Sequence, residues 1–529
     1  MLIRLVFIGQ FPAGLNADEA ALGYNAYSLL QTGLDEHGHF LPVNLESFGD
    51  FKPALYAYLL VPLVKLFGLT EIIVRLPSAF FGAAAVLFLY LLVRLLSEDK
   101  RIALLSATVL TISPWHIHFS RGAWEVNLAT SFLILGCLSF ISWTRKLKQQ
   151  HLLFSIFFFA ISMYTYQSTR VIAPILGLGL VVIYNKKLWN NIGQLIKGSI
   201  LLVLLLLPLA LSLIFSDAAS RVGGVGLLAD EGPLNFVKEL RGDHSGATML
   251  VGKLLHNRPV IYSIQFIKNY LTHFDGNFLF VNGDVIQRNL VPETGLLYFS
   301  DFFLILIGLI FLSKSPSPLS RLVFLWLFIA PLASAMTFQV PHALRAQNMV
   351  IPLSVLIAVG TVSALDKLKS LSSKYFIFVC CLLLVFSYSY QFSRYLHQYY
   401  VHYPKTYPAA WEYGFRELSA YLSDNMSRYR EVLITDKYDQ PYILLLFYLR
   451  YSPADFHTGH ELTVRDKYNF STVKEFSRFH FINTSWDNVR DMHNSLIVAA
   501  PDDIPAVGVN VVKTIYFPNG DPAFKIISN

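Results

Sequence analysis

Long apolar runs, repeated along most of the chain, are the feature that most constrains its fold. As helices, such runs are long enough to cross a hydrocarbon core about 30 Å thick. Only 15% of the 529 residues are charged, whereas a soluble protein carries about 25%. The sequence therefore predicts a mainly α, polytopic transmembrane helical bundle and argues against a water-soluble enzyme. The expected spans lie near residues 75–96, 101–119, 125–144, 151–165, 171–184, 196–216, 298–313, 320–337, 344–364 and 375–391.

Charge and cysteine usage exclude other classes of protein. The formal charge is +7. The sequence has no basic face with interleaved aromatic residues of the kind that nucleic-acid binding requires. The three cysteines, Cys137, Cys380 and Cys381, all lie in apolar runs. Neither a disulfide framework nor a thiolate metal site is indicated.

Basic residues fix the expected orientation. Alternate connections are short and rich in lysine and arginine, and the positive-inside rule places them in the cytoplasm. They are SEDKR, TRKLKQQ, NKKLWNN, SKSPSPLSR and DKLKSLSSK. The other connections and the C-terminal tail then face outward. We expect a multi-pass protein of the plasma (inner) membrane with its site and C-terminal domain extracytoplasmic.

Two apolar stretches do not fit this alternation. Residues 1–10 are too short to span and are interrupted by Arg4, so we interpret them as a clipped or misassigned first transmembrane helix, giving about eleven spans in all. Residues 54–68 contain Pro62 and Lys65. If they spanned, every later loop would invert, so they are expected to lie along the outer interface as an amphipathic helix.

The composition changes after residue 391. We expect a transmembrane domain over 1–391, with an outer catalytic loop at 11–74 and a large outer loop at 217–297 that carries structure of its own. Residues 392–529 have ordinary polarity and alternate helical and strand-like pieces, which predicts a small α/β domain.

Charged residues gather on the outer loops in short strings. In LNADEA, Asp18 and Glu19 begin an amphipathic helix, and in GDFKPALY, Lys52 precedes Pro53. Acids at a helix N-terminus also simply complement its dipole, and an interfacial lysine is often only an anchor.

Three further outer strings lie at helix ends. SPWHIHFSRGAWEVN carries His116, His118, Arg121 and Glu125. As a zinc site this string is weak, since no third ligand has a suitable spacing, and Arg121 and Glu125 could pair across a helix turn. Arg170 opens one helix, while His342 and Arg345 open another. Interfacial anchoring explains each of these equally well.

The convergence of these charges is more informative than any one of them. Ionisable residues at membrane depth are costly and mark functional sites. Arginine and lysine can hold phosphate oxygens, while a carboxylate can take a proton from an attacking hydroxyl. The combination suits a lipid-linked phosphate substrate beside an activated hydroxyl.

The motifs GLNADEAALGYNAYSLLQTG, FKPALYAYLLVPLVKLFG, EIIVRLPSAFFG, SPWHIHFSR and VPHALRA resemble, in order and spacing, those of bacterial glycosyltransferase family 39. This family includes protein O-mannosyltransferases and lipid A aminoarabinose transferases with the GT-C membrane fold. The resemblance covers residues 10–365. It implies transfer of a sugar from a polyprenyl-phosphate donor at the outer face of the membrane to a glycan, lipid or protein acceptor.

Position by position, the resemblance implies that Asp18 is the catalytic base, with Glu19 its neighbour, and that Lys52 lies near the donor phosphate. Arg121, Arg170 and Arg345 match basic positions at helix ends and are expected to bind that phosphate as well. Glu125, with His116, His118 and His342, is left for the acceptor or a divalent cation; no cofactor is certain. The tail resembles no sugar-binding repeat of the eukaryotic mannosyltransferases.

Two other functions fit part of the pattern. A transporter or flippase of lipid-linked saccharides would also carry cationic outer residues, although such proteins place polar residues near the bilayer midplane in repeated halves. A non-catalytic scaffold displaying the C-terminal domain leaves the clustered acids and cations unexplained.

Overall fold

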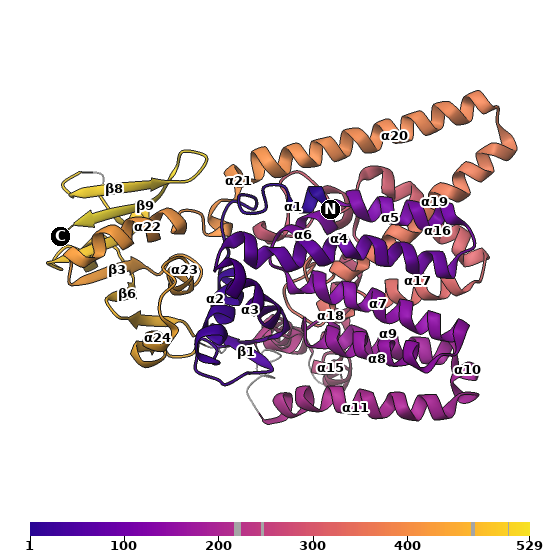
Figure 1. Ribbon diagram of the computed structural model, residues 1–529, viewed down its shortest axis with the longest axis horizontal. Coiled ribbons are helices and arrows are strands. Elements are labelled where there is room, and N and C mark those ends of the chain that lie inside the picture. Colours follow the sequence, from indigo (N-terminus) through magenta and orange to yellow (C-terminus); the bar gives the residue numbers. More distant parts are fainter. Residues whose placement is uncertain (216–223, 245–247, 467–470, 506, 529) are drawn as a thin grey trace. The chain divides into compact units, whose positions relative to one another are not determined.

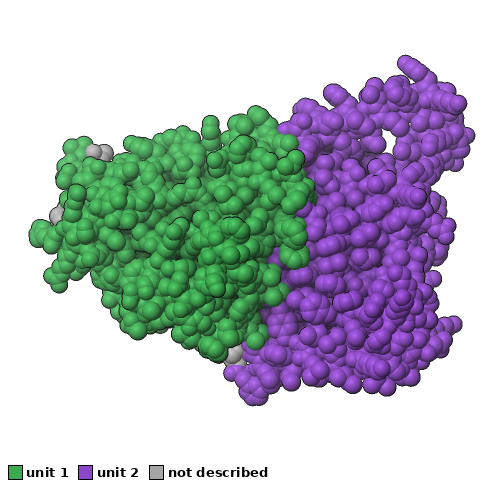
Figure 2. Space-filling view, in the orientation of Figure 1, with its two compact units in different colours: residues 1–81, 119–125, 396–529 green, residues 82–118, 126–395 purple. Residues whose placement is uncertain are grey.

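The computed structural model describes residues 1–215, 224–244, 248–466, 471–505 and 507–528 (Figure 1). The chain forms two compact units, coloured separately in Figure 2. Unit 1 comprises residues 1–81, 119–125 and 396–529, and unit 2 comprises residues 82–118 and 126–395. The C-terminal part therefore shares its unit with the N-terminal segment rather than standing alone.

Residues 1–10 are helical only over Leu2–Leu5, whereas each of the ten expected spans contains helix. These helices are α4 (Glu71–Leu96), α5 (Lys100–Ile112), α6 (Pro114–Arg121), α7 (Glu125–Lys146), α8 (Gln149–Met163), α9 (Thr169–Ile183), α11 (Ile192–Phe215), α16 (Phe299–Lys314), α17 (Pro318–Ile329), α18 (Leu332–Ala335), α19 (Val350–Leu371) and α20 (Lys374–His397). In the part of the chain that is described, six helices are long and apolar enough to cross a membrane, or seven if α5 and α6 form one bent span. The helices α8 and α9 have 15 residues each, fewer than the roughly 20 that an untilted span needs.

Helix α19 forms the core of unit 2. Its apolar window is 83% buried, against 11% for α11 and 0% for α20. Glycines let α16 approach it closely: a Cβ on Gly360 would lie 1.9 Å from the Leu304 carbonyl oxygen, and one on Gly308 would lie 2.2 Å from that of Leu356. Small residues at such a crossing bring two backbones into contact in a membrane bundle.

The span expected at 101–119 is two helices, α5 and α6, bent by 55°. Ser113 is extended (ψ 123°) immediately before Pro114. A residue before proline avoids the helical region because of a steric clash, so the helix ends there. The helix expected over 101–119 is therefore broken at Ser113 rather than continuous.

The expected large loop at 217–297 carries helices. They are α13 (Gly232–Gly242), α14 (Met249–Leu255) and α15 (Arg258–Thr272). Residues 216–223 and 245–247 of this region lie outside the described chain.

Unit 1 contains a seven-stranded mixed sheet in the order β4-β5-β6-β3-β7-β9-β8. The strands are β3 (Glu431–Thr435), β4 (His460–Leu462), β5 (Val473–Phe476), β6 (Phe479–Ile482), β7 (Ser495–Ala499), β8 (Val511–Tyr516) and β9 (Pro522–Ser528). The central strand β3 is parallel to both β6 and β7. Leu433, Ile497 and Ile527 belong to the hydrophobic core on one face of this sheet. The α/β character expected for the tail is confirmed.

The N-terminal part of unit 1 is built on α2 (Ala17–Thr32), which follows the short helix α1 (Leu2–Leu5). It packs against α3 (Leu55–Phe67) and against α23 (Pro441–Tyr448) and α24 (Pro453–Gly459) of the tail. The segment expected at the interface is thus a 13-residue helix, about 20 Å long. That length is too short for a span, although its position in a membrane stays a prediction.

The predicted orientation can be tested by cysteine labelling in intact cells, after replacing the three native cysteines. Lys65 of α3 and Asp424 of α22 (Phe415–Asn425) are exposed, so cysteines there should react with an impermeant thiol reagent from outside. A cysteine at exposed Lys187 should react only after permeabilisation. Labelling of Lys65→Cys only after permeabilisation would mean that the loop polarity is inverted.

Candidate active site

The start of α2 separates the two acids of the LNADEA string. Asn16 caps the helix: its Oδ1 accepts from the Glu19 N–H (3.0 Å), and the Glu19 carboxylate accepts from the Asn16 N–H (3.3 Å). This reciprocal capping box turns Glu19 inward. Asp18, its neighbour on the helix, is the one residue between Leu15 and Ala26 that is not buried.

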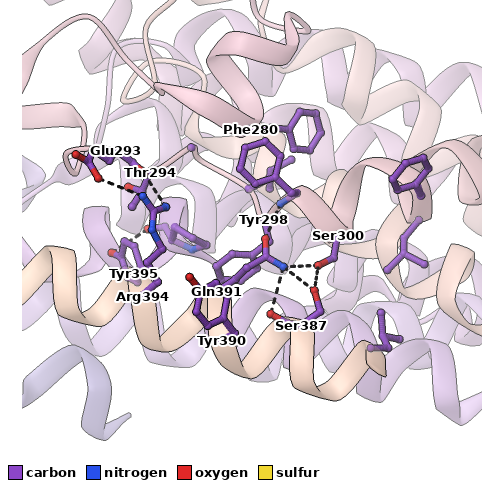
Figure 3. Close-up of a pocket in the computed structure, with 17 residues that line it drawn as sticks. Phe280, Glu293, Thr294, Tyr298, Ser300, Ser387, Tyr390, Gln391, Arg394 and Tyr395 are labelled. Carbon is purple, nitrogen blue, oxygen red and sulfur yellow. Dashed lines mark hydrogen bonds and ion pairs between the residues drawn. The ribbon is translucent and has the colours of Figure 1, made fainter. Parts of the chain in front are cut away.

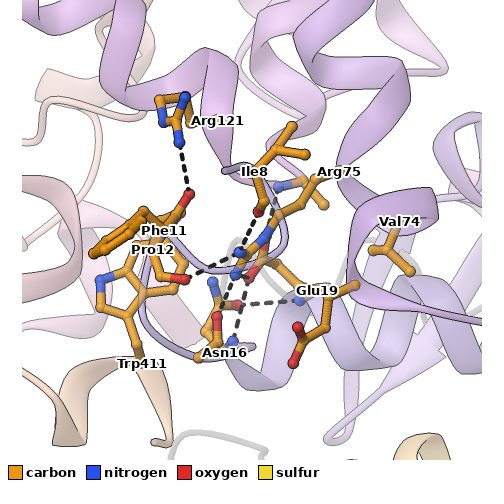
Figure 4. A network of polar contacts seen from close by, with 12 residues as sticks. Ile8, Phe11, Pro12, Asn16, Glu19, Val74, Arg75, Arg121 and Trp411 are labelled. Atoms are coloured by element: carbon orange, nitrogen blue, oxygen red, sulfur yellow. Dashed lines mark hydrogen bonds and ion pairs between the residues drawn. The ribbon is translucent and has the colours of Figure 1, made fainter. Parts of the chain in front are cut away.

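Glu19 is held in a buried bidentate ion pair with Arg75 of α4 (Figure 4). The two N···O distances are 2.9 Å and 2.8 Å, and both side chains are 0% exposed. The Ala123 N–H also donates to Glu19 (2.7 Å). Both carboxylate oxygens therefore have partners, as a buried charge requires.

Two buried arginines fix the backbone that precedes α2. Arg75 donates to the carbonyls of Ile8 (2.9 Å), Pro12 (3.1 Å) and Gly14. Arg121 donates to the carbonyls of Ile3 (2.7 Å), Val6 (2.8 Å) and Phe11 (3.2 Å), and Figure 4 shows it pointing to Phe11. The Asp18 backbone is thereby placed on a braced segment.

Lys52 pairs with Asp18. It lies on β2 (Asp50–Pro53), which forms an antiparallel hairpin with β1 (Asn44–Ser47). The hairpin turns at Phe48 and Gly49, which both have positive φ, as a two-residue type I′ turn requires. The ammonium donates to the Asp18 carboxylate and lies 4.4 Å from the centre of the Phe48 ring. The side chain of Asp18 is 31% exposed and that of Lys52 is 10% exposed, so the pair lies at the surface of unit 1.

Glu125 also belongs to unit 1, as the buried first residue of α7. Arg121 ends α6, so the two residues lie on different helices. Their spacing of four residues therefore does not imply pairing across one helix turn.

The remaining predicted site residues belong to unit 2. His116 and His118 are buried on α6, and His118 Nε2 lies 2.9 Å from the Arg288 carbonyl oxygen. Arg170 donates to the Met163 carbonyl (3.2 Å). Both of these contacts are to backbone carbonyl oxygens.

Unit 2 also contains an acid that sequence reasoning missed. Asp284 is buried, accepts from the Ala343 N–H (2.6 Å) and lies 3.7 Å from His342 Nδ1. Burial raises its pKa. Nearby, Arg345 donates to the Thr337 hydroxyl (2.7 Å). Asp284 lies in the segment FLFVNGDVIQRNLVPETGLLY. Its position directly after Asn-Gly was the local sequence signal for a carboxylate placed at a turn.

Within the described ranges, no group of three or more histidine, cysteine, aspartate or glutamate side chains is arranged to hold a metal ion. His116 and His118 lie on one short helix, two residues apart. Side chains at that spacing point to different faces of a helix.

Comparison with known proteins identifies the fold. Residues 51–211 match the family model described as dolichyl-phosphate-mannose-protein mannosyltransferase. The structure resembles ArnT from Cupriavidus metallidurans in the apo state, with a TM-score of 0.56 and 12% identity over 99% of this chain and 95% of that one. The fold is that of the GT-C membrane glycosyltransferases. The resemblance to glycosyltransferase family 39 is thus confirmed.

Two further GT-C structures match along the chain. ArnT from the same organism bound to undecaprenyl phosphate has a TM-score of 0.54 and 11% identity, covering 99% of this chain and 96% of that one. The Archaeoglobus fulgidus oligosaccharyltransferase, tethered to an acceptor peptide containing the NVT sequon, has a TM-score of 0.50 and 12% identity, covering 99% and 72%. A search of curated protein sequences gave no match.

Proposed function

We propose that this GT-C protein transfers a sugar from a polyprenyl-phosphate donor to an acceptor hydroxyl at the outer face of the plasma membrane. The observation that carries the proposal is the pair of Asp18 and Lys52. In this pair a partly exposed carboxylate lies beside an ammonium. The other residues between Leu15 and Ala26 are buried. The carboxylate can accept a proton from a hydroxyl, and the ammonium can bind a phosphate.

The proposed reaction inverts the anomeric centre. The Asp18 carboxylate takes the proton of the acceptor hydroxyl, and the oxygen attacks the anomeric carbon. The bond from that carbon to the phosphate oxygen breaks on the opposite side, and polyprenyl phosphate leaves with the electron pair. Lys52 stabilises the charge that grows on the leaving phosphate.

The ion pair gives the two residues a shared role. The Lys52 ammonium is held by Asp18. A phosphate with more negative charge competes for it, and moving Lys52 toward the donor releases the carboxylate to accept a proton. Donor binding would thereby prepare the base.

The other predicted residues divide between positioning and binding. Glu19 and Arg121 have their charged groups engaged within unit 1, so we assign them to positioning the Asp18 segment. Arg170 and Arg345 stay proposals for the donor phosphate, and Glu125, His116, His118 and His342 stay proposals for the acceptor or a divalent cation.

The compared proteins support a lipid-phosphate donor and a separate acceptor molecule. One ArnT structure holds undecaprenyl phosphate, and the archaeal oligosaccharyltransferase holds an acceptor peptide. The matched family is described by a dolichyl-phosphate-linked sugar. A polyprenyl phosphate carrier is common to two of these descriptions.

Lys52→Ala is expected to weaken donor binding about 10- to 100-fold, because a hydrogen bond to a charged group contributes roughly 1.5–3 kcal/mol. Binding of a polyprenyl-phosphate sugar to purified protein would be measured by titration. The exposed Lys65→Ala on α3 serves as the control and should bind normally. Equal donor affinity of Lys52→Ala and the wild type would remove Lys52 from the donor site.

A further inference from the structure

A cavity of about 840 Å³ lies within unit 2, and none of the residues assigned above lines it (Figure 3). Its walls are the first turns of α16, the last turns of α20 and the loop at 293–298. This volume is within the range of about 300–1,000 Å³ that ligand sites occupy.

One end of the cavity carries a fixed pair of opposite charges. The Arg394 guanidinium lies 3.2 Å from the Glu293 carboxylate and donates to the Glu293 carbonyl (2.9 Å). Glu293 has a positive φ of 54°, so the loop turns sharply to place it there. The side chains are 41% and 72% exposed, which leaves both charges accessible from solvent.

The middle of the cavity has a polar wall whose groups are already paired. Gln391 accepts from the Phe299 N–H (2.8 Å) and donates to the hydroxyl of Ser387 (3.0 Å) and to that of Ser300. The two hydroxyls lie 3.0 Å apart. Figure 3 shows this network joining α16 to α20. The wall is therefore a rigid connection that needs no further ligand.

The other end of the cavity is apolar. It is lined by Phe299, Phe303, Leu304 and Leu384, and by Phe280 from the short π-helix Asn277–Val281. Phe303 is 67% exposed and Phe299 is 59% exposed. Both rings lie on α16, where the exposed residues Phe302, Leu306 and Ile310 are apolar as well, so this end suits a hydrocarbon chain.

The sequence of α20 sets the cavity at the membrane boundary. The apolar window of this helix is 0% buried within the protein, as expected of a helix that faces lipid. The run SYSYQFSRYLHQYY follows the apolar stretch, and tyrosines of this kind are enriched at headgroup level. Arg394 lies in that run, while Leu384 lies in the apolar stretch.

We propose that this cavity binds a zwitterionic phospholipid with an ammonium headgroup. Its phosphate would bind Arg394, its ammonium would bind Glu293, and one acyl chain would follow the apolar end between α16 and α20. The charges at the mouth sum to zero, so a headgroup with both charges matches them. An anionic lipid, or a polyprenyl phosphate, would bring its negative charge against Glu293. The site is independent of the proposed transfer reaction.

The lipid would also have a structural effect. The C-terminal half of α20 contacts the rest of unit 2 through the polar wall near Gln391 and through the Arg394–Glu293 pair. Tyr388 and Tyr395 of the same half donate to Asp301 and to the Pro114 carbonyl, while the apolar window of α20 is unburied. An acyl chain between α16 and α20 would extend that contact along the helix. Bound lipid should therefore raise the thermal stability of the protein.

The test uses the full chain, purified and delipidated in detergent, with short-chain phosphatidylethanolamine as the probe. We expect saturable binding in native mass spectrometry, and about tenfold weaker binding by Arg394→Gln and by Glu293→Gln, because each loses one charged hydrogen bond. Exposed Arg490→Gln, from an ion pair in unit 1, is the matched control and should bind as the wild type does. A photoactivatable acyl chain should label peptides that contain Phe303 or Leu384.

Three outcomes would overturn the proposal. Equal binding of phosphatidylethanolamine and phosphatidylglycerol by all variants would indicate bulk lipid only. Stronger binding of a polyprenyl phosphate would assign the cavity to the donor. Labelling spread evenly over the apolar helices would show that no chain is held. If a single variant fails to fold, the exchanged pair Glu293→Arg with Arg394→Glu should retain the phospholipid, and its loss would count against the site.

Discussion

Asp18→Asn is expected to lower single-turnover sugar transfer about 10²- to 10⁴-fold, since a positioned general base contributes that much. Asparagine keeps nearly the same volume but cannot take the proton from the acceptor hydroxyl. The donor should still bind, because Lys52 remains. The loss should therefore appear in the rate constant of the chemical step rather than in donor affinity. Rapid-quench transfer assays, normalised to folded protein, would measure it.

The control for this variant is Asp455→Asn. Asp455 is an exposed acid in the first turn of α24, so it has the same interaction with a helix dipole as Asp18 but no proposed role in transfer. It should transfer at the wild-type rate. If Asp18→Asn does so too, Asp18 is only a helix-end acid and the catalytic assignment fails.

Arg75→Met is expected to destabilise the protein by about 3–5 kcal/mol, because it leaves Glu19 buried without its counter-charge. Glu19→Gln should cause a smaller loss, since the Arg75 guanidinium keeps three backbone carbonyl acceptors and glutamine can still accept from the Ala123 N–H. The double variant Glu19→Leu with Arg75→Met should recover part of the stability, as no unpaired charge remains. Denaturant or thermal unfolding in detergent would be followed for all three.

A matched control for Arg75 is Arg101→Met. Arg101 pairs with Asp366 at 2.8 Å on the exposed end of α5, where solvent weakens the interaction, so little change is expected. A stability loss by Arg75→Met no larger than that of Arg101→Met would contradict the structural role of the Glu19–Arg75 pair.

The helices could be predicted from the sequence because an apolar run of span length has few alternatives to helix in a membrane. Segments 75–96 and 125–144 differ from α4 and α7 by only a few residues at their ends. The break at Pro114 was missed because 101–119 was treated as one apolar run, although α6 is more polar than α5. The proline itself was the available signal.

The strands of the tail were predictable one by one, but their order was not. Residues EVLITD and NVVKTIYF have the composition of strands, and they form β3 and β8. Their partners are set by distant residues: β3 pairs with β6 and β7, far along the chain. Local patterns carry no information on such pairing.

The candidate site was predictable as a set of residues but not as a set of roles. The sequence presents Asp18 and Glu19 as equal neighbours, and only the packing of α2 shows that Glu19 faces Arg75 and Asp18 faces outward. The spacing from Asn16 to Glu19 is the signature of a capping box and was the local signal for that difference. Arg75 itself was visible as an arginine near the start of an apolar helix, a position where a buried charge needs a partner.

The most direct test of the account is the fate of the sugar–phosphate bond in the donor. Purified protein in proteoliposomes would receive a polyprenyl-phosphate sugar labelled in the sugar, together with an extract of envelope glycans and lipids as acceptor. We predict release of free polyprenyl phosphate in equal amount to the sugar transferred, with inverted anomeric configuration in the product. Movement of intact donor across the bilayer, with no cleavage of that bond, would contradict the account and favour a flippase.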